Sequence, residues 1–146
     1  MAPEFSLHVL VIGLRDRPGA VHSVAEVFSG RGLQMEAFFG TAGSQSPDDS
    51  AQALILFRAA AERADFVARV LRRLPAVLSV ELLAPDDASL VHSVLVATPV
   101  SAGEGVSLAT LSPGVALAAG TPAAMQAWLA GTAPRRLGAL RLERAG

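Results

Sequence analysis

The segment GLRDRPG, residues 13–19, has the residue types and spacing best suited to chemistry in this chain. It lies between an apolar run and an amphipathic stretch, so it predicts a strand, a turn and the start of a helix. The unpaired N–H groups and positive dipole end of such a helix favour a carboxylate. We expect the N–H groups of Gly19, Ala20 and Val21 to hold it. Asp16 can accept the ammonium group that a free α-amino acid carries on the same carbon, so the segment predicts an amino-acid site.

An ordinary strand-to-helix turn is the alternative for the same residues. Pro18 suits the first position of a helix, and Gly19 allows backbone and strand to approach closely. The residue types of this one turn leave both interpretations open.

Other candidate residues favour structural roles. The histidines His8, His22 and His92 lack the i, i+4 spacing of a metal site, although His22 lies close enough to the turn to reach the rim of a pocket. The doublets Asp48-Asp49 and Asp86-Asp87 stand among Pro and Ser residues, which predicts solvated turns rather than calcium ligands. We therefore expect no metal and no cofactor.

The composition excludes several classes of protein. The 146 residues include no cysteine and no tyrosine, and all 12 basic residues are arginine. Without lysine there is no Walker A motif, Schiff base or pyridoxal phosphate attachment. The net charge is −1 and acidic and basic residues are mixed along the chain, so the sequence predicts no basic surface for nucleic acid or an anionic membrane. The apolar run near the start has no basic residues before it and is too short to span a bilayer, which predicts a cytoplasmic protein.

The first half of the chain predicts the order β-α-β-β-α-β, a ferredoxin-like arrangement. Residues 6–14 form a strand that is apolar on both faces, and the following helix places Val21, Val24, Ala25 and Phe28 on one stripe. The remaining expected elements are strands at 33–40, 53–60 and 77–85 and a helix at 61–75. This helix has five residues predicted to face inward: Phe66, Val67, Val70, Leu71 and Leu74. The polar connection 41–52 is long, and we expect it to be mobile.

The second half predicts β-β-β-α-β, the same order without the first helix. Its strands are expected at 90–98, on both sides of a Pro113-Gly114 turn, and at 137–144. A helix is expected at 121–131, with Thr121 as N-cap and Gly131 closing it. We predict domains at residues 5–85 and 88–146, the second being either a degenerate structural repeat or an accessory extension.

Residues 6–84 resemble an ACT domain. The resemblance rests on a strand ending in D-R-P-G, a helix starting A-V-x-x-V-A-x-x-F, and G-L-x-M-E within the β-α-β-β-α-β order. It implies binding of an amino acid or related metabolite at a domain or dimer interface, and regulation of a partner activity. The second half has no D-x-P-G turn, so any site of its own is expected to be lost, and the whole is similar to the small tandem-ACT regulators.

The resemblance also implies which residues contact the ligand. Arg15 and Asp16 occupy the turn positions that often bear polar contacts. The segment whose backbone faces the ligand corresponds to Pro18, Gly19, Ala20 and Val21. The second-strand positions that commonly line the same pocket correspond to Met35, Glu36 and Ala37.

We therefore expect an α+β protein that binds a small metabolite without catalysis, forms a homodimer and acts on a regulated protein partner. Two other classes stay open. One is a small ferredoxin-like enzyme acting on a hydrophobic metabolite, with His22 or Glu36 as acid or base. The other is an assembly module with no ligand, whose turn is only a turn.

Overall fold

The computed structural model describes residues 4–41, 50–138 and 141–144. The chain divides into two compact units, Met1–Ala84 and Pro85–Gly146, and each is described by itself. Most of the connection expected to be mobile, including Asp48 and Asp49, lies outside the described residues.

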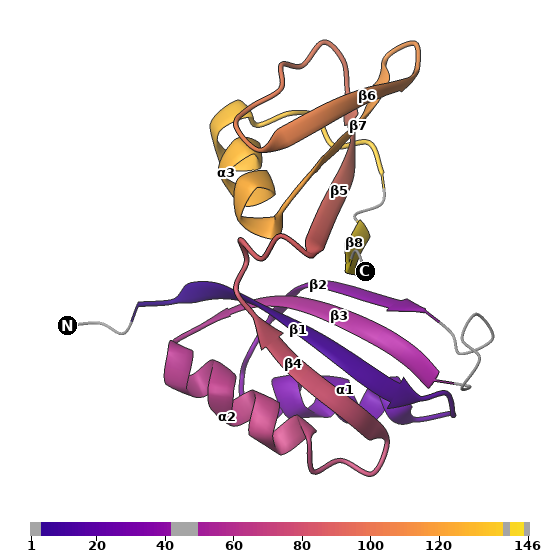
Figure 1. The fold of residues 1–146 in the computed structure, drawn as a ribbon, viewed down its shortest axis with the longest axis vertical. Coiled ribbons are helices and arrows are strands. Elements are labelled where there is room, and N and C mark those ends of the chain that lie inside the picture. Colours follow the sequence, from indigo (N-terminus) through magenta and orange to yellow (C-terminus); the bar gives the residue numbers. More distant parts are fainter. Residues whose placement is uncertain (1–3, 42–49, 139–140, 145–146) are drawn as a thin grey trace. The chain divides into compact units, whose positions relative to one another are not determined.

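The first unit has the predicted β-α-β-β-α-β order. Its elements are β1 (Ser6–Arg15), α1 (Ala20–Ser29), β2 (Met35–Thr41), β3 (Ser50–Ala59), α2 (Ala61–Leu71) and β4 (Val77–Leu83). The strands form an antiparallel sheet in the order β2-β3-β1-β4. Both helices lie on one face of this sheet (Figure 1), which confirms the predicted α+β fold.

Strand β1 is central because both of its faces are apolar. Leu10, Ile12 and Leu14 belong to the core shared with the helices. Val9 and Val11, on the other face, are buried as well. Strand β1 pairs with β3 on one edge and with β4 on the other, so it lies inside the sheet.

The inward stripes of the two helices differ from those predicted. Helix α1 buries Ala20, Val24, Val27 and Phe28, whereas the predicted Val21 is 51% exposed. Helix α2 buries a stripe that excludes Phe66 and consists of Ala64, Val67, Ala68 and Leu71. Each residue turns a helix by about 100°, so a shift of one position moves a side chain from the core to the edge. Small alanines allow both helices to approach the sheet along a line that the larger side chains alone do not predict.

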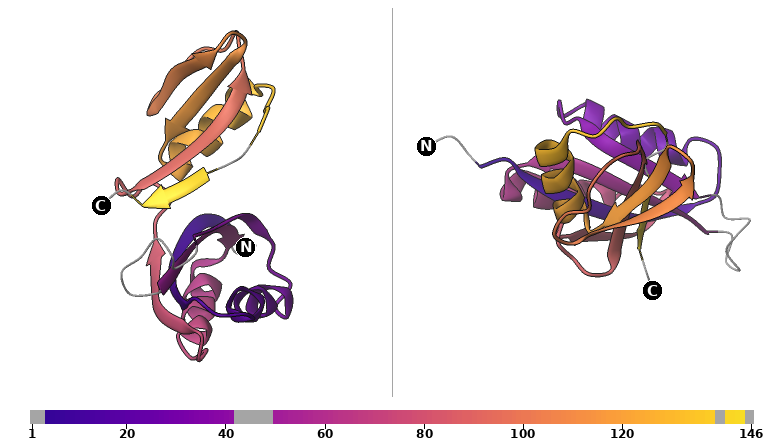
Figure 2. Two further views of the ribbon diagram at one scale, coloured as in Figure 1. Left: turned by 90° about the vertical axis from the view of Figure 1, so that its right-hand side faces the viewer. Right: turned by 90° about the horizontal axis from the view of Figure 1, so that it is seen from above.

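The second unit repeats the sheet of the first without a counterpart of α1. Its elements are β5 (Leu90–Ala97), β6 (Val106–Ser112), β7 (Val115–Gly120), α3 (Pro122–Thr132) and β8 (Arg141–Arg144). The strand order is β6-β7-β5-β8, which matches β2-β3-β1-β4 position by position. Helix α3 covers one face of this sheet (Figure 2). The shared strand order favours a repeat over an accessory extension.

Local signals in the second unit are confirmed except at the end of α3 and at the last strand, which was predicted at 137–144 whereas β8 begins at Arg141 and residues 137–138 are not strand. Gly114 has φ +82°, as expected in the turn between β6 and β7. The Thr121 side chain caps α3 by accepting a hydrogen bond from the N–H of Ala124 at 3.3 Å. Gly131 does not close the helix: it lies inside α3, whose C-cap is Ala133 with φ +45°. No helix among the described residues is long and apolar enough to cross a bilayer.

Candidate functional site

The turn between β1 and α1 leaves a helix start without a side-chain cap. Strand β1 ends at Arg15, and Gly19 takes the N-cap position of α1 with φ +88° and ψ −12°. No side chain accepts a hydrogen bond at this cap. Glycine adopts positive φ at little cost, so Gly19 lets the chain turn directly into the helix. Residues 15–19 are all exposed, and the helix therefore begins at the molecular surface.

The open donors of α1 lie slightly further along the chain than predicted. The N–H of Ala20 donates to the carbonyl of Arg17 at 3.3 Å, and the N–H of Ser23 donates to the carbonyl of Gly19 at 3.0 Å. Within the described part of the chain, the N–H groups of Val21 and His22 have no backbone acceptor. A carboxylate at this helix start would therefore meet Val21 and His22 first. The sequence pattern did not include the N–H of His22, because it placed the first helical position at Pro18, whereas α1 begins two residues later at Ala20.

Arg15 fixes the position of the turn. Its backbone N–H donates to the carbonyl of Ala76 at 2.9 Å, and its Nε donates to the carbonyl of Pro75 at 3.3 Å. Both acceptors lie between α2 and β4, so Arg15 joins two connections at the same end of the sheet. Asp16 and Arg17 follow it on the surface, which places both signs of charge beside the helix start.

The predicted residues of β2 do not lie beside this turn. On β3, Arg15 pairs with Ser50, whereas Ala37 pairs with Leu56. Six residues of strand separate these two levels, about 20 Å at 3.4 Å per residue. Met35 and Glu36 lie at the same far end of the sheet, and Glu36 accepts a hydrogen bond from Arg58 Nε at 2.8 Å. Within one chain, the turn and the β2 residues therefore cannot line a single pocket.

The two side chains considered as an acid or base lie on the surface. His22 Nε2 is 3.2 Å from Glu26 Oε1, and these side chains are 75% and 67% exposed. Glu36 is bound to Arg58. Exposed ion pairs of this kind leave both groups in water rather than in an enclosed cleft, so their surroundings do not favour catalysis.

The remaining histidines and acidic residues have structural surroundings. His8 Nε2 lies 3.0 Å from the carbonyl of Ala59. His92 is 1% exposed, and burial followed by the charge of Arg136 lowers its pKa to about 4. Asp87 accepts hydrogen bonds from the hydroxyl and N–H of Ser89 at 2.6 and 2.9 Å, which lower the pKa of its carboxyl and confirm its turn role. Among the described residues, no group of three or more His, Cys, Asp or Glu side chains could hold a metal ion.

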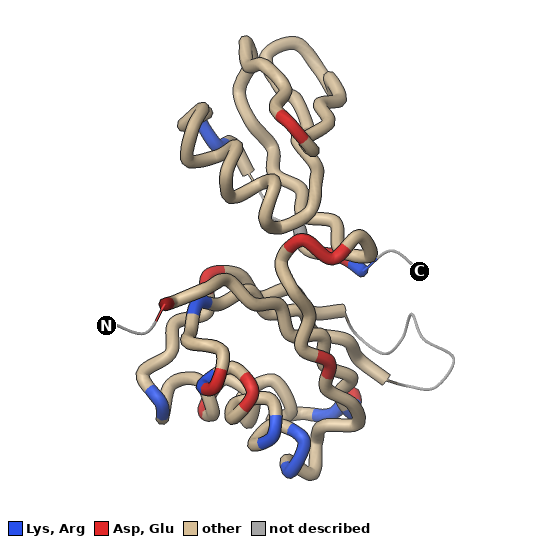
Figure 3. Tube along the Cα trace, turned by 60° about the vertical axis from the view of Figure 1, so that its left-hand side comes forward, with Lys and Arg blue, Asp and Glu red and all other residues tan. Residues whose placement is uncertain are grey.

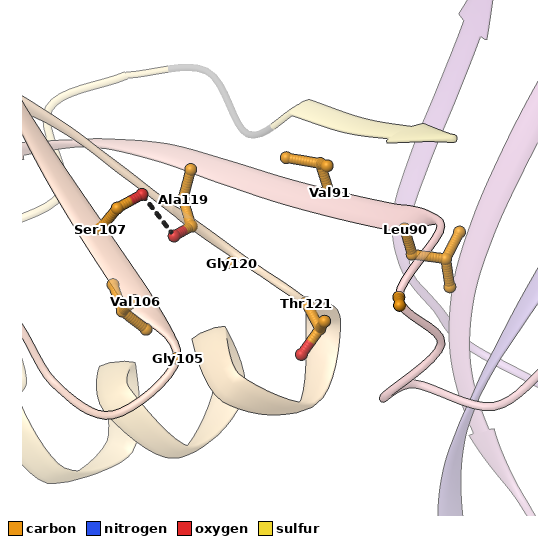
Figure 4. Close-up of a pocket in the computed structure, with 9 residues that line it drawn as sticks. Leu90, Val91, Gly105, Val106, Ser107, Ala119, Gly120 and Thr121 are labelled. Carbon is orange, nitrogen blue, oxygen red and sulfur yellow. Dashed lines mark hydrogen bonds between the residues drawn. The ribbon is translucent and has the colours of Figure 1, made fainter. Parts of the chain in front are cut away.

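The second unit has a hollow of about 560 Å³ beside the start of α3 (Figure 4). Its lining carries no charge and consists of Ala88, Leu90, Val91, Gly105, Val106, Ser107, Ala119, Gly120 and Thr121. The donors of α3 that would face an anion are occupied: the N–H of Ala123 donates to the carbonyl of Pro85 at 2.8 Å, and that of Ala124 donates to Thr121. Pro122 has no N–H. The start of α3 therefore has no open N–H groups at Ala123 and Ala124, whereas the start of α1 has open N–H groups at Val21 and His22.

Comparison with known proteins gives a match in structure only. No protein-family model and no curated protein matches the sequence. The small subunit of acetolactate synthase from Thermotoga maritima is similar in structure, with a TM-score of 0.58 and 14% sequence identity. The match covers 95% of this chain and 94% of that chain. At this identity the similarity shows a shared fold, with two four-stranded antiparallel α+β units in one chain.

Proposed function

We propose that this chain is a non-catalytic regulatory subunit that binds an amino acid or a similar small metabolite at the turn between β1 and α1. The observation that carries the proposal is the uncapped, exposed start of α1. The N–H groups of Val21 and His22 would receive the carboxylate of the ligand, and Gly19 keeps the backbone open toward it. Asp16, three residues before Gly19, would receive the ammonium group.

A second copy of the chain would complete this site. Met35, Glu36 and Ala37 lie about 20 Å from the turn within one chain, so they can contact the same ligand only if they come from another molecule. Strand β2 is an edge strand of its sheet. An unpaired edge offers backbone groups for association. A homodimer in which β2 of one copy lies beside the turn of the other would bring the two sets of residues together.

Regulation of a separate enzyme is the role that fits this arrangement. The structurally similar protein is the small subunit of an enzyme, and a small subunit acts beside a larger one. The ACT resemblance of residues 6–84 implies the same kind of role. The exposed pairs formed by His22 and Glu36 give no support to the alternative of an enzyme.

The experiment that tests the proposal is thermal denaturation with each of the twenty amino acids, on wild type, Asp16→Asn and Asp86→Asn. A ligand at about 100 times its Kd adds about 2.7 kcal/mol to the stability of the native state. In a chain of this size the midpoint should rise by several degrees. We expect a rise with one or a few amino acids in wild type and in Asp86→Asn, whose substitution removes an exposed carboxylate in the second unit, and no rise in Asp16→Asn.

Two results would contradict the proposal. If no amino acid shifts the midpoint of wild type, the turn is not an amino-acid site. If Asp16→Asn responds like wild type, Asp16 does not hold the ammonium group. Circular dichroism of both variants without ligand would show that the fold is retained.

A further inference from the structure

The outer face of α2 carries an exposed aromatic ring surrounded by arginines. Phe66 is 47% exposed. The guanidinium carbon of Arg31 lies 5.4 Å from the centroid of its ring, and that of Arg69 lies 5.9 Å away. Both distances are within the range of cation–π attraction. We call the surface formed by Phe66, Arg69, Val70, Arg73 and the neighbouring Arg31 the α2 patch.

The α2 patch contains a hollow that can take one side chain. Phe66, Arg69, Val70 and Arg73 line a hollow of about 130 Å³. A cavity of about 150 Å³ is large enough for benzene, so this one has room for a single leucine-sized group. Its lining is almost entirely apolar and combines Phe66 and Val70 with Arg69 and Arg73. An apolar side chain flanked by carboxylates would match both features.

Arg31, Arg63 and Arg72 donate side-chain hydrogen bonds to backbone carbonyls, but three charged residues of α2 are not used in ion pairs among the described residues. In the described part of the chain, Glu62, Asp65 and Arg69 form no ion pair. Asp65 and Arg69 are four residues apart on α2, a spacing at which a salt bridge often forms, yet the guanidinium of Arg69 lies over Phe66 instead. Figure 3 shows blue segments on the helical side of this unit, with red ones between them.

The charge balance points to an acidic partner. Five of the 12 arginines lie at the patch or next to it: Arg31, Arg63, Arg69, Arg72 and Arg73. Only two acidic residues accompany them on α2, Glu62 and Asp65, so this surface is basic in a chain whose net charge is −1. Aromatic residues and arginine are enriched in protein interfaces, and they supply most of the residues that dominate binding energy.

A protein fits this surface better than a nucleic acid or a lipid. Glu62 and Asp65 share a broader hollow of about 540 Å³ with Arg69 and Arg72. A partner at the α2 patch must place carboxylates beside Arg69 and Arg73 and none against Glu62 and Asp65, a pattern that a protein can supply residue by residue and that the evenly charged backbone of a nucleic acid cannot. The hollow beside Phe66 also requires an apolar side chain, which a phosphodiester backbone does not have.

We infer that the α2 patch is the docking surface for a partner protein that presents an acidic segment with one apolar side chain. This inference deepens the proposed regulatory function, because it names the surface through which the chain would reach the protein it regulates. The apolar side chain fills the hollow formed by Phe66 and Val70. Carboxylates on both sides of it contact Arg69 and Arg73.

The test uses the full chain and three fluorescein-labelled probes. The first is a 12-residue peptide with one central Leu, two Asp or Glu residues on each side of it and uncharged residues toward both ends. The second is the same peptide with Gly in place of Leu, and the third is an oligothymidylate of equal length. Binding is measured by fluorescence anisotropy at low and at high salt, on wild type, Phe66→Ala, Arg69→Glu and two control variants. The controls, Phe5→Ala and Arg135→Glu, change an exposed phenylalanine and an exposed arginine outside the patch.

We expect the Leu peptide to bind wild type at least about tenfold more tightly than the Gly peptide, a ratio that corresponds to burying one apolar side chain. Salt should weaken binding, because the arginines are exposed. Arg69→Glu and Phe66→Ala should each weaken binding about tenfold or more, while both controls bind like wild type. Circular dichroism would show that Arg69→Glu keeps the fold, since its side chain is exposed.

Three results would overturn the inference. These are no binding of the Leu peptide at low salt, equal binding by wild type and Arg69→Glu, and tighter binding of the oligothymidylate than of the peptide. The amino-acid response is measured on the same variants and separates the two proposals. If an amino acid stabilises Arg69→Glu normally but the peptide binds no variant, the docking surface is wrong and the ligand site stands. If the peptide binds and no amino acid raises the midpoint of denaturation, the ligand site is wrong and the docking surface stands.

Discussion

The Nε of Arg15 donates to the carbonyl of Pro75 across 3.3 Å, and this bond joins the turn before α1 to the connection after α2. The backbone N–H of Arg15 adds a second bond to the neighbouring Ala76 at 2.9 Å. Arg15 was expected to contact the ligand because of its place in the turn. The structure shows that the same side chain orients the turn on which Asp16 and Gly19 stand.

The first prediction separates the side-chain bond of Arg15 from its backbone bond. Arg15→Met keeps the N–H that donates to Ala76 but loses the donor to Pro75, a change of about 1 kcal/mol for an ordinary hydrogen bond. We expect a weaker amino-acid response than in wild type, without the complete loss expected for Asp16→Asn. Isothermal titration with the amino acid found by the thermal screen would measure the affinity of wild type and of Arg15→Met. Complete loss in Arg15→Met would mean that the guanidinium itself contacts the ligand.

The second prediction concerns two glycines with opposite effects on stability. Gly19 has φ +88°, and a Cβ added there would meet no atom within 4 Å, so Gly19→Ala changes only the backbone energy. Because this left-handed region is unfavourable for alanine, the free energy of unfolding should fall by about 1–2 kcal/mol. Gly131 lies within α3 and also has open space around it. Gly131→Ala should raise the free energy of unfolding by about 0.5–1 kcal/mol.

Urea denaturation of both glycine variants gives these values directly. Equal stability of Gly19→Ala and wild type would show that the turn can adopt another conformation without cost. In that case the open donors of Val21 and His22 would not be fixed by the position of Gly19.

The third prediction is a pH dependence caused by His92. Burial, helped by the charge of Arg136, lowers the pKa of His92 from 6.5 to about 4. Between these two values the unfolded chain binds more protons than the folded chain, so stability falls as the pH decreases from 6.5 toward 4 and is unaffected by this group above 6.5. The loss reaches about 3 kcal/mol, since each unit of pKa corresponds to about 1.4 kcal/mol.

Substitution of His92 should remove this dependence. Both ring nitrogens of His92 are buried without a partner among the described residues, so His92→Leu also removes two unsatisfied polar atoms. We expect a flatter curve of unfolding free energy between pH 7 and about 4.5, with no loss at pH 7. His22→Gln, which changes an exposed histidine, should keep the slope of wild type. If the unfolding free energy of His92→Leu falls with decreasing pH as steeply as that of wild type, a group other than His92 causes the pH dependence.

The fourth prediction concerns the packing of Trp128, the one tryptophan of the chain. Its Nε1 donates to the carbonyl of Ser101 at 3.0 Å, and a Cβ added at Gly103 would lie 2.7 Å from its Cδ1. Gly103→Ala should therefore displace the indole and lower the free energy of unfolding by about 1–3 kcal/mol. Tryptophan emission during denaturation reports the change. Ser101→Ala keeps the carbonyl and should unfold like wild type; a similar loss in both variants would contradict the steric explanation.

The sequence predicted the elements of both units but not which side chains face the core of the first. Apolar periodicity and turn residues gave the order of strands and helices, because these signals are local. The inward stripe of α1 was wrong at Val21, and that of α2 was wrong at Phe66. Helix α2 packs Ala64 and Ala68 into the core and helix α1 buries Val27, and which of several apolar positions on a helix faces the sheet depends on how the two elements pack.

The candidate site was predictable only in part, for a related reason. The run of Asp16, Pro18 and Gly19 predicted the turn and the helix start, and both are found. The sequence resemblance also placed Met35, Glu36 and Ala37 in the same pocket, but strand pairing puts them at the other end of the sheet. Pairing register joins residues far apart in the chain, so the separation of Arg15 from Ala37 follows from tertiary structure alone.

The sequence by itself determined the strand and helix order, the Pro113-Gly114 turn, the Thr121 cap and the turn at the DRPG segment, because each depends on neighbouring residues. Tertiary structure decided the rest. It set the matching strand order of the two sheets, the use of Arg15 to hold the turn, the burial of His92 and the exposure of Phe66 among arginines. Each of these arises when distant segments pack together and remove some groups from water while leaving others in it.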